Sequence, residues 1–269
     1  GIDAEKFLQG QLSCDVAALD EQSITFGTIN NPKGRMYGLL KVIRIENGFL
    51  IRIEQSCTEE FLNNISKYKV FFKCEIATEN KYQSLAFIAI KDDENSLPKE
   101  SNKLKCIDSS FISRTSDNYL MFEVWTQDTP EIDKVTNMNT EEWYALEAKA
   151  GIPELYSCTQ DQFILQNLNL QELGAVSFKK GCYPGQEVVA RLHYLGKPSR
   201  RMSIAEANAT ELPANGDEVK TGAGDIAGHV VRSQLNDKNT IQLLVSLKLS
   251  EQDTALFISN TVELKLVTN

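Results

Sequence analysis

The strongest constraint on the fold lies in the last part of the chain, from about residue 198 to the end. Apolar residues recur there at every second position, and glycines stand between the apolar segments. This alternation is typical of short strands that bury one face and are joined by tight turns. The clearest examples are Ile241, Leu243, Val245 and Leu247, and then Val262, Leu264 and Leu266. Residues 198–269 therefore predict a small all-β unit, which we expect to close as a barrel.

The rest of the chain mixes helical and strand patterns. An apolar stripe predicts a helix over residues 3–19, capped by Asp3, and Asn47-Gly48 predicts a hairpin between antiparallel strands. Further helices are predicted after Ser56, which would form a capping box with Glu59, and after Thr140. The polar segment 91–118 is expected to be a solvated connection with some strand or helix embedded in it. Further strands are predicted at residues 24–29, 36–45, 49–53, 70–76, 85–90 and 119–125.

Composition excludes several classes of protein. The formal net charge of −9 argues against a broad grip on nucleic acid or on an anionic membrane. No apolar run reaches the roughly 18 residues that a membrane helix needs. The six cysteines are scattered without a C-x-x-C pair and there are two histidines, so neither a disulfide framework nor a metal site is expected. This cysteine usage predicts a reducing, cytoplasmic environment.

One segment, residues 177–191, fits no single secondary-structure period. Its residues predict a strand end, a tight turn and the start of a helix that ends near Gly196. Cys182 lies just before that helix, where free backbone N–H groups and the neighbouring Lys179 and Lys180 would favour a thiolate. Free cysteines are also among the most buried residues in proteins. The segment alone therefore leaves two readings of Cys182 open, a reactive thiol and a buried turn residue.

Two other places carry side chains suited to a ligand. Lys33 and Arg35 stand at the tip of a predicted hairpin loop, where they would suit an anion, although charged hairpin tips are usually only solvated. Trp143 stands near the start of a predicted helix that ends before Pro153, and it would either fill the core or line a pocket. Neither place identifies a ligand by itself.

Four motifs along the chain resemble the YgfZ family of folate-binding proteins, which is related to mitochondrial iron–sulfur assembly factors. They are Phe7-Leu8-Gln9-Gly10-Gln11-Leu12, Pro32-Lys33-Gly34-Arg35, Phe163 with Gln166 and Asn169-Leu170, and Lys180-Gly181-Cys182-Tyr183-Pro184-Gly185-Gln186-Glu187. The family is similar in fold to the T-protein, the aminomethyltransferase of the glycine cleavage system. The resemblance implies an α+β, aminomethyltransferase-like folate-binding fold of antiparallel sheets and helices with a C-terminal β-barrel. It divides the chain into a discontinuous folate-binding core (residues 1–45 and 137–197), an inserted α+β domain (46–136) and the barrel (198–269).

The resemblance also implies a ligand and the residues that hold it. The ligand is tetrahydrofolate or a related folate in a central cavity, and Trp143 matches a tryptophan that contacts folate in the bacterial family. Cys182 is implied as the functional thiol, and no metal site is implied. The other folate-binding residues expected from the matched motifs are Lys33, Arg35, Tyr183, Gln186, Glu187 and Arg191.

Two departures from the T-protein pattern bear on the chemistry. T-proteins carry a catalytic aspartate in the strand after the first hairpin, whereas residues 34–40 of this chain contain no carboxylate. General acid–base help at the folate nitrogen is therefore missing, and ordinary aminomethyltransferase activity is not expected. T-proteins also place a pterin-holding glutamate two residues before Gly151, where this chain has Lys149. Glu147 and Glu187 are the carboxylates that would substitute for it.

The sequence and the resemblance together predict a folate-binding accessory protein that supports the assembly or repair of iron–sulfur enzymes, including enzymes that modify tRNA. The expected partners are folate and iron–sulfur client or assembly proteins, with no membrane and no direct binding of tRNA. A tetrahydrofolate-dependent, aminomethyltransferase-like enzyme of one-carbon transfer is the alternative. A tRNA-binding module is a third reading, which the net acidity disfavours.

Overall fold

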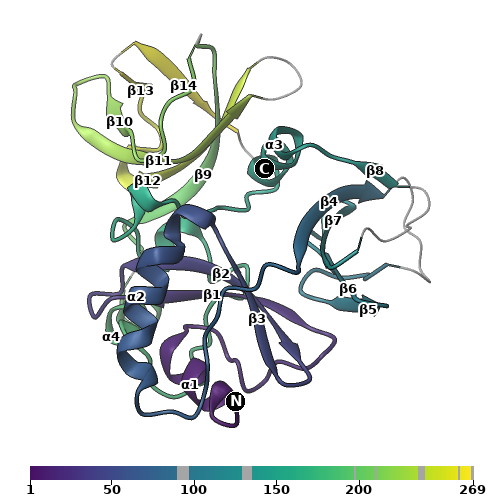
Figure 1. The fold of residues 1–269 in the computed structure, drawn as a ribbon. Coiled ribbons are helices and arrows are strands. Elements are labelled where there is room, and N and C mark those ends of the chain that lie inside the picture. Colours follow the sequence, from purple (N-terminus) through teal and green to yellow (C-terminus); the bar gives the residue numbers. More distant parts are fainter. Residues whose placement is uncertain are drawn as a thin grey trace.

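The computed structural model describes residues 1–89, 97–128, 135–196, 198–209, 211–235, 240–259 and 261–267. Three units of secondary structure surround a common centre (Figure 1). The first is a three-stranded sheet with two helices, the second a five-stranded sheet, and the third a closed six-stranded barrel. The predicted α+β fold with antiparallel sheets, helices and a C-terminal barrel is therefore confirmed.

The first unit places its helices on one face of its sheet. It consists of α1 (Ala4–Gln11), β1 (Ile24–Asn30), β2 (Met36–Ile45), β3 (Gly48–Ile53) and α2 (Thr58–Lys69). The strands are antiparallel in the order β1-β2-β3. Leu40 and Val42 of β2 join Phe7 of α1 and Phe61 of α2 in one core, whereas Leu39 belongs to a second core. Alternation along a strand therefore turns the other face of β2 toward the centre of the molecule.

Helix α1 is shorter than the sequence predicts. Leu12 already has an extended backbone, with φ −98° and ψ 156°, and Ser13 N donates to the Thr28 carbonyl of β1 at 3.0 Å. The chain after α1 thus pairs with β1 instead of continuing the helix. Asp3 does not cap the helix with its side chain, because its carboxylate accepts a hydrogen bond from Lys73 N.

The segment after α2 is not the predicted strand. Residues 70–76 lie in the described part of the chain and belong to no strand, and the side chains of Val70 and Phe71 are 79% and 82% exposed. An alternating pattern gives a strand only where a neighbouring strand supplies hydrogen-bond partners. The expected capping box at Ser56 is also absent, because Ser56 N donates to the Glu54 carboxylate and α2 has no side-chain cap.

The second unit is a five-stranded antiparallel sheet in the order β5-β6-β7-β4-β8. Its strands are β4 (Gln83–Ala89), β5 (Leu104–Ile107), β6 (Ser110–Arg114), β7 (Met121–Thr126) and β8 (Val135–Asn137). The segment predicted as a connection thus contains β5 and β6, and its residues 91–96 lie outside the described part. The domain boundary predicted at residue 46 falls inside the first sheet, since β3 pairs with β2 along its whole length.

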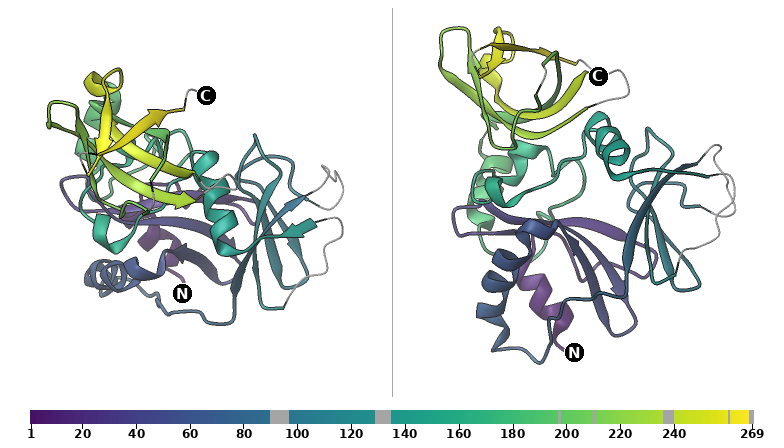
Figure 2. Two further views of the ribbon diagram at one scale, coloured as in Figure 1. Left: turned by 90° about the horizontal axis from the view of Figure 1, so that it is seen from above. Right: turned by 45° about the horizontal axis from the view of Figure 1, so that its top comes forward.

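Two helices connect the sheets to the barrel. Helix α3 (Thr140–Lys149) lies between the barrel and the five-stranded sheet in every view (Figures 1 and 2). Its cap is Asn139 rather than Thr140, because the Asn139 side chain accepts from Glu142 N and the Glu142 carboxylate accepts from Asn139 N. Helix α4 (Gln186–Tyr194) follows the segment rich in motif residues. None of the described helices is long and apolar enough to cross a membrane.

The barrel closes in the order β10-β11-β12-β9-β14-β13, with β13 paired back to β10. Its strands are β9 (Arg200–Ala207), β10 (Glu218–Thr221), β11 (Ile226–Leu235), β12 (Ile241–Lys248), β13 (Leu256–Ile258) and β14 (Val262–Leu266). The predicted alternation fills the barrel, since Leu243, Val245 and Leu247 of β12 lie in its inner core. Leu244 points the other way and joins the central core with Leu39 of β2. The barrel is therefore attached to the first unit through buried apolar side chains.

Candidate functional site

Two motif loops meet at the start of α4. Gly185 precedes the helix with φ 81°, and a Cβ on it would lie 2.6 Å from the Asn31 carbonyl oxygen and 2.7 Å from Gly34 Cα. Gly34 has φ 76° and faces the side chain of Val188. The backbone conformation disfavours a side chain at both positions, and at Gly185 there is also no space for one. The loop of residues 31–35 and the loop before α4 are thus fixed against each other.

The loop of residues 31–35 is held by its own polar groups. The Asn31 side-chain oxygen accepts from Lys33 N at 2.8 Å and from Arg35 N at 3.0 Å. Arg35 Nη1 donates to the backbone carbonyls of Asp161 and Gln162, at 3.2 and 2.6 Å. The guanidinium of Arg35 therefore ties this loop to a distant segment, whereas the side chain of Lys33 is exposed.

Lys180 anchors the other end of the loop that carries Cys182. Its Nζ donates to the carbonyls of Leu12 and Cys14, both at 2.7 Å, and lies 5.5 Å from the centre of the Tyr183 ring. Burial lowers the pKa of Lys180 to about 8 and raises the pKa of Tyr183 to about 12. The ammonium group that the sequence placed beside the thiol is thus used to bind the segment after α1.

Cys182 is exposed between these two anchors. The structure therefore excludes the reading of Cys182 as a buried turn residue. Tyr183 next to it is buried, Gln186 is half-buried, and Glu187 and Arg191 are exposed on α4. The arrangement presents one thiol to solvent on a loop whose two ends are pinned to the first unit.

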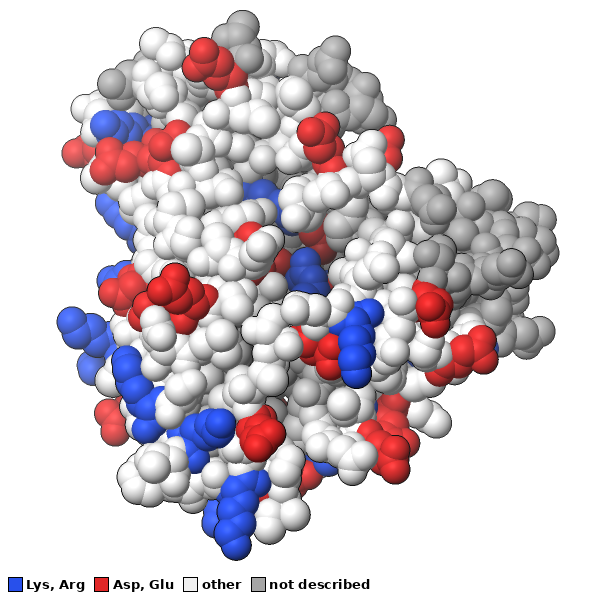
Figure 3. Space-filling view, viewed as in Figure 1, with Lys and Arg blue, Asp and Glu red and all other residues white. Residues whose placement is uncertain are grey.

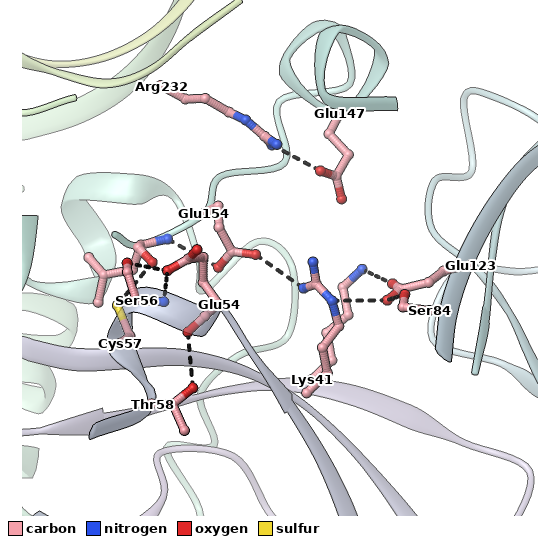
Figure 4. A network of polar contacts seen from close by, with 12 residues as sticks. Lys41, Glu54, Ser56, Cys57, Thr58, Ser84, Glu123, Glu147, Glu154 and Arg232 are labelled. Carbon is pink, nitrogen blue, oxygen red and sulfur yellow. Dashed lines mark hydrogen bonds and ion pairs between the residues drawn. The ribbon is translucent and has the colours of Figure 1, made fainter. Parts of the chain in front are cut away.

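A second polar site lies where the three units meet, and the sequence reading did not foresee it (Figure 4). Lys41 Nζ contacts Glu123 Oε2 at 2.5 Å, and Arg52 bridges Glu123 and Glu154 with two contacts of 3.1 Å. We call this set, with the Arg232–Glu147 ion pair, the central cluster. Its members are Lys41 of β2, Arg52 of β3, Glu123 of β7, Glu147 of α3, Glu154 of the following loop and Arg232 of β11.

The central cluster is largely hidden from solvent. The side chains of Lys41 and Glu123 are 6% and 2% exposed, and that of Arg52 is 26% exposed. Figure 3 shows this face of the molecule hollowed between the units, with acidic and basic atoms at the floor of the hollow. One feature of the sequence could have predicted this cluster, namely the charged residue Lys41 inside the apolar strand β2. A charged residue that is buried in a strand needs a partner of opposite charge.

The pKa values of the two carboxylates that Arg52 bridges shift in opposite directions. Burial favours the protonated form of Glu123, but Lys41 and Arg52 outweigh it and lower the pKa of Glu123 to about 2. Burial raises the pKa of Glu154 despite the neighbouring Arg52, and the nearby Glu147 adds to the rise. Glu123 is therefore a stable anion, whereas Glu154 holds a proton more readily than a free glutamate.

The residues expected to hold folate fall into two places. Trp143 is 6% exposed and lies on α3, which stands apart from α4 in Figure 1. Lys149 is exposed, with its Nζ 5.7 Å from the Tyr119 ring. Of the two carboxylates considered as substitutes at that position, Glu147 belongs to the central cluster, whereas Glu187 is exposed on α4.

Comparison with known proteins identifies the family and the fold. No family model matches the chain. The structure is similar to the crystal structure of the glycine cleavage system aminomethyltransferase T from Bartonella henselae, with a TM-score of 0.73 and 16% identity over 99% of this chain and 80% of that one. The sequence is 32% identical over 239 residues to the tRNA-modifying protein YgfZ of Enterobacter sp. (strain 638), covering 84% of this chain and 73% of that protein. The chain therefore belongs to the YgfZ family, and its fold is that of the aminomethyltransferases.

Proposed function

We propose that this protein is a folate-binding accessory factor that supports the assembly or repair of iron–sulfur enzymes, with tRNA-modifying enzymes among its clients. The observation that carries the proposal is the exposed thiol of Cys182 on a doubly anchored loop. The name of the Enterobacter relative, a tRNA-modifying protein, supports the link to tRNA.

The role of Cys182 follows from the fact that it is a single thiol. A thiolate is both a nucleophile and a ligand for soft metals. Iron–sulfur clusters usually take four protein ligands, so one cysteine does not hold a cluster by itself. We therefore assign Cys182 a transient contact with sulfur, iron or the cluster of a partner, which supplies the remaining ligands. Tyr183 follows Cys182 on its loop, and Gln186, Glu187 and Arg191 lie on the helix α4 that comes next. We assign these residues, which the resemblance implied as folate ligands, to presentation of the thiol.

We place the folate at the central cluster. Trp143 offers an aromatic surface on α3, and Glu147 offers a carboxylate to ring N–H groups. The buried Nε and Nη2 of Arg232 have no acceptor among the described residues. A folate carries both a planar ring with donors and a tail with carboxylates, so these residues match its two kinds of group. When bound, tetrahydrofolate would supply a carrier for one-carbon units on its ring nitrogens.

Complementation tests the role of the thiol. A bacterium that lacks its YgfZ protein is supplied with the wild-type chain, with Cys182→Ser or with Cys158→Ser, and the level of thiolated tRNA nucleosides is measured. Cys158 is also an exposed cysteine and serves as the matched control. The Cys182 variant should fail and the Cys158 variant should succeed, with equal circular dichroism spectra. If Cys182→Ser restores thiolated tRNA nucleosides to the level reached with the wild-type chain, the proposed role of Cys182 is wrong.

Fluorescence titration tests the ligand. The chain contains two tryptophans, so Trp143→Phe leaves Trp125 as the remaining fluorophore. Tetrahydrofolate should quench the fluorescence of the wild-type protein in a saturable way, and the variant should lose most of the response. A wild-type protein that shows neither quenching nor heat of binding would contradict the folate assignment and leave the role of Cys182 to stand on the complementation test.

A further inference from the structure

Arg232 of β11 is fixed on two sides by α3. Its Nη1 donates to Glu147 Oε2 at 2.9 Å, and its guanidinium carbon lies 4.0 Å from the centre of the Tyr144 ring. The arginine is 1% exposed, which is rare for a residue that always carries its charge. Figure 4 shows Arg232 and Glu147 pointing toward one another from the barrel and from α3.

The remaining edge of the guanidinium has no hydrogen-bond partner in the described part of the chain. Nε and Nη2 are both buried, and no described group accepts a hydrogen bond from either. Tyr144 covers the flat face of the guanidinium and Glu147 engages Nη1, so the buried edge formed by Nε and Nη2 is the part of the guanidinium that lacks an acceptor. This edge presents two parallel N–H groups, the geometry that binds both oxygens of one carboxylate. A buried charged donor without an acceptor is costly, so an acceptor at this edge stabilises the protein.

The charges of the central cluster favour an anion as that acceptor. The cluster consists of Lys41, Arg52 and Arg232 facing Glu123, Glu147 and Glu154. Burial raises the pKa of Glu154, with Arg52 opposing the rise and Glu147 adding to it. Glu154 therefore neutralises the surrounding cations less fully than Glu123 does. A carboxylate at the Nε–Nη2 edge of Arg232 supplies both a negative charge and two hydrogen-bond acceptors.

We propose that the Nε–Nη2 edge of Arg232 binds a carboxylate of the ligand held at the central cluster, with Glu147 and Tyr144 fixing the guanidinium in the orientation that this requires. The identity of the ligand as a folate rests on the proposed function. The choice of a carboxylate rests on Arg232 and on the charges around it. In a folate, the matching group is a carboxylate of the glutamate tail.

The test compares ligands that carry a carboxylate with one that does not. Tetrahydrofolate carries the glutamate tail, p-aminobenzoylglutamate keeps the tail without the pterin, and 6-methyltetrahydropterin keeps the pterin without any carboxylate. Calorimetric titration with Arg232→Met should show binding of the first two ligands weakened at least tenfold relative to wild type. Binding of 6-methyltetrahydropterin should change less than twofold.

Three further variants separate recognition from folding. Arg232→Lys keeps the charge without the two-pronged edge, so it should lose nearly as much affinity as Arg232→Met. A double variant with Glu147→Gln and Arg232→Met removes the unpaired carboxylate, and it should fold and still bind the tailed ligands weakly. Arg201→Met changes an exposed arginine of the same barrel and should bind as wild type does.

The outcomes keep the two proposals apart. Wild-type binding of tetrahydrofolate that Arg232→Met leaves unchanged overturns the inference, as does an equal loss for 6-methyltetrahydropterin. A high-resolution structure of the tetrahydrofolate complex with only ordered water on Nε and Nη2 also overturns it. If the wild-type protein binds no folate, the proposed function fails, and glutarate then tests the edge alone. Glutarate binding that Arg232→Met abolishes supports the inference, and absence of glutarate binding refutes it.

Discussion

Gly185 approaches Gly34 so closely that a Cβ on Gly185 would lie 2.7 Å from the Gly34 Cα. The two glycines have φ angles of 81° and 76°, a region that other residues rarely adopt. Their contact joins the loop before β2 to the loop before α4, and Cys182 stands on the second of these loops. The place of the thiol thus depends on two residues that are distant in the sequence.

Replacement of Gly185 by alanine should displace the two loops. A left-handed backbone costs a residue with a side chain about 1–2 kcal/mol, and the clash with the Asn31 carbonyl adds a cost of similar size. We expect a loss of about 3 kcal/mol in the free energy of unfolding, measured by chemical denaturation. Gly181→Ala is the matched control, because a Cβ there meets nothing within 4 Å, and it should change stability by less than about 0.5 kcal/mol. Equal stability of the two variants would contradict the role of the contact.

Removal of the Lys180 ammonium should loosen the loop of Cys182 at its other end. Lys180→Met leaves the carbonyls of Leu12 and Cys14 without this donor, a loss of about 2 kcal/mol. Backbone hydrogen exchange of residues 177–185 should become faster in the variant. Lys179→Met changes the exposed neighbour and should leave both stability and exchange as in wild type. If residues 177–185 exchange as slowly in Lys180→Met as in the wild-type protein, Lys180 does not anchor this loop.

Glu123 should contribute to stability in a defined range of pH. Its pKa in the folded protein, about 2, lies below the ordinary value of 4.5, so its contribution is present above pH 4.5 and is lost as the pH falls toward 2. Glu123→Gln leaves Lys41 buried without its carboxylate, which costs about 3 kcal/mol at neutral pH. The difference between wild type and variant should shrink between pH 4.5 and 2, as followed by denaturant unfolding at each pH.

A surface pair provides the control for the Glu123 experiment. Arg201 and Glu172 form an ion pair with side chains that are 44% and 54% exposed. Exposed pairs contribute about 0–1 kcal/mol, so Glu172→Gln should have a small effect. A difference between wild type and Glu123→Gln that stays constant from pH 7 to pH 2 would mean that Glu123 has no lowered pKa.

Aminomethyl transfer should be absent. Residues 36–40 of β2 carry no carboxylate, and Gly38 and Leu39 are buried between apolar neighbours. Because the strand position at which T-proteins carry their catalytic aspartate has no carboxylate here, the reaction lacks the general acid–base group of those enzymes. The assay mixes aminomethyl-lipoyl carrier protein, tetrahydrofolate and this protein and follows methylenetetrahydrofolate, with an authentic aminomethyltransferase as positive control. Turnover above the blank would contradict this prediction and favour the enzymatic alternative.

Local patterns in the sequence determined much of the fold. The alternation in residues 241–247 and 262–266 predicted β12 and β14 of the barrel, and Asn47-Gly48 predicted the β2–β3 hairpin. These features depend on the period of the backbone and on turn chemistry, both of which short stretches of sequence express. The motif around Cys182 likewise predicted a turn followed by a helix, which is α4.

The tertiary structure alone decided which of these elements meet. Helix α1 stops early because the chain after it pairs with β1, and residues 70–76 form no strand although their pattern alternates. The Gly34–Gly185 contact, the Lys180 anchor and the central cluster each join segments that are far apart in the chain. Such contacts depend on how whole units pack and on the need of a buried charge for a partner. The period of a sequence carries no information about either. The sequence therefore pointed to Cys182 as a candidate functional thiol, whereas its surroundings and the partners of Arg232 depend on the tertiary structure.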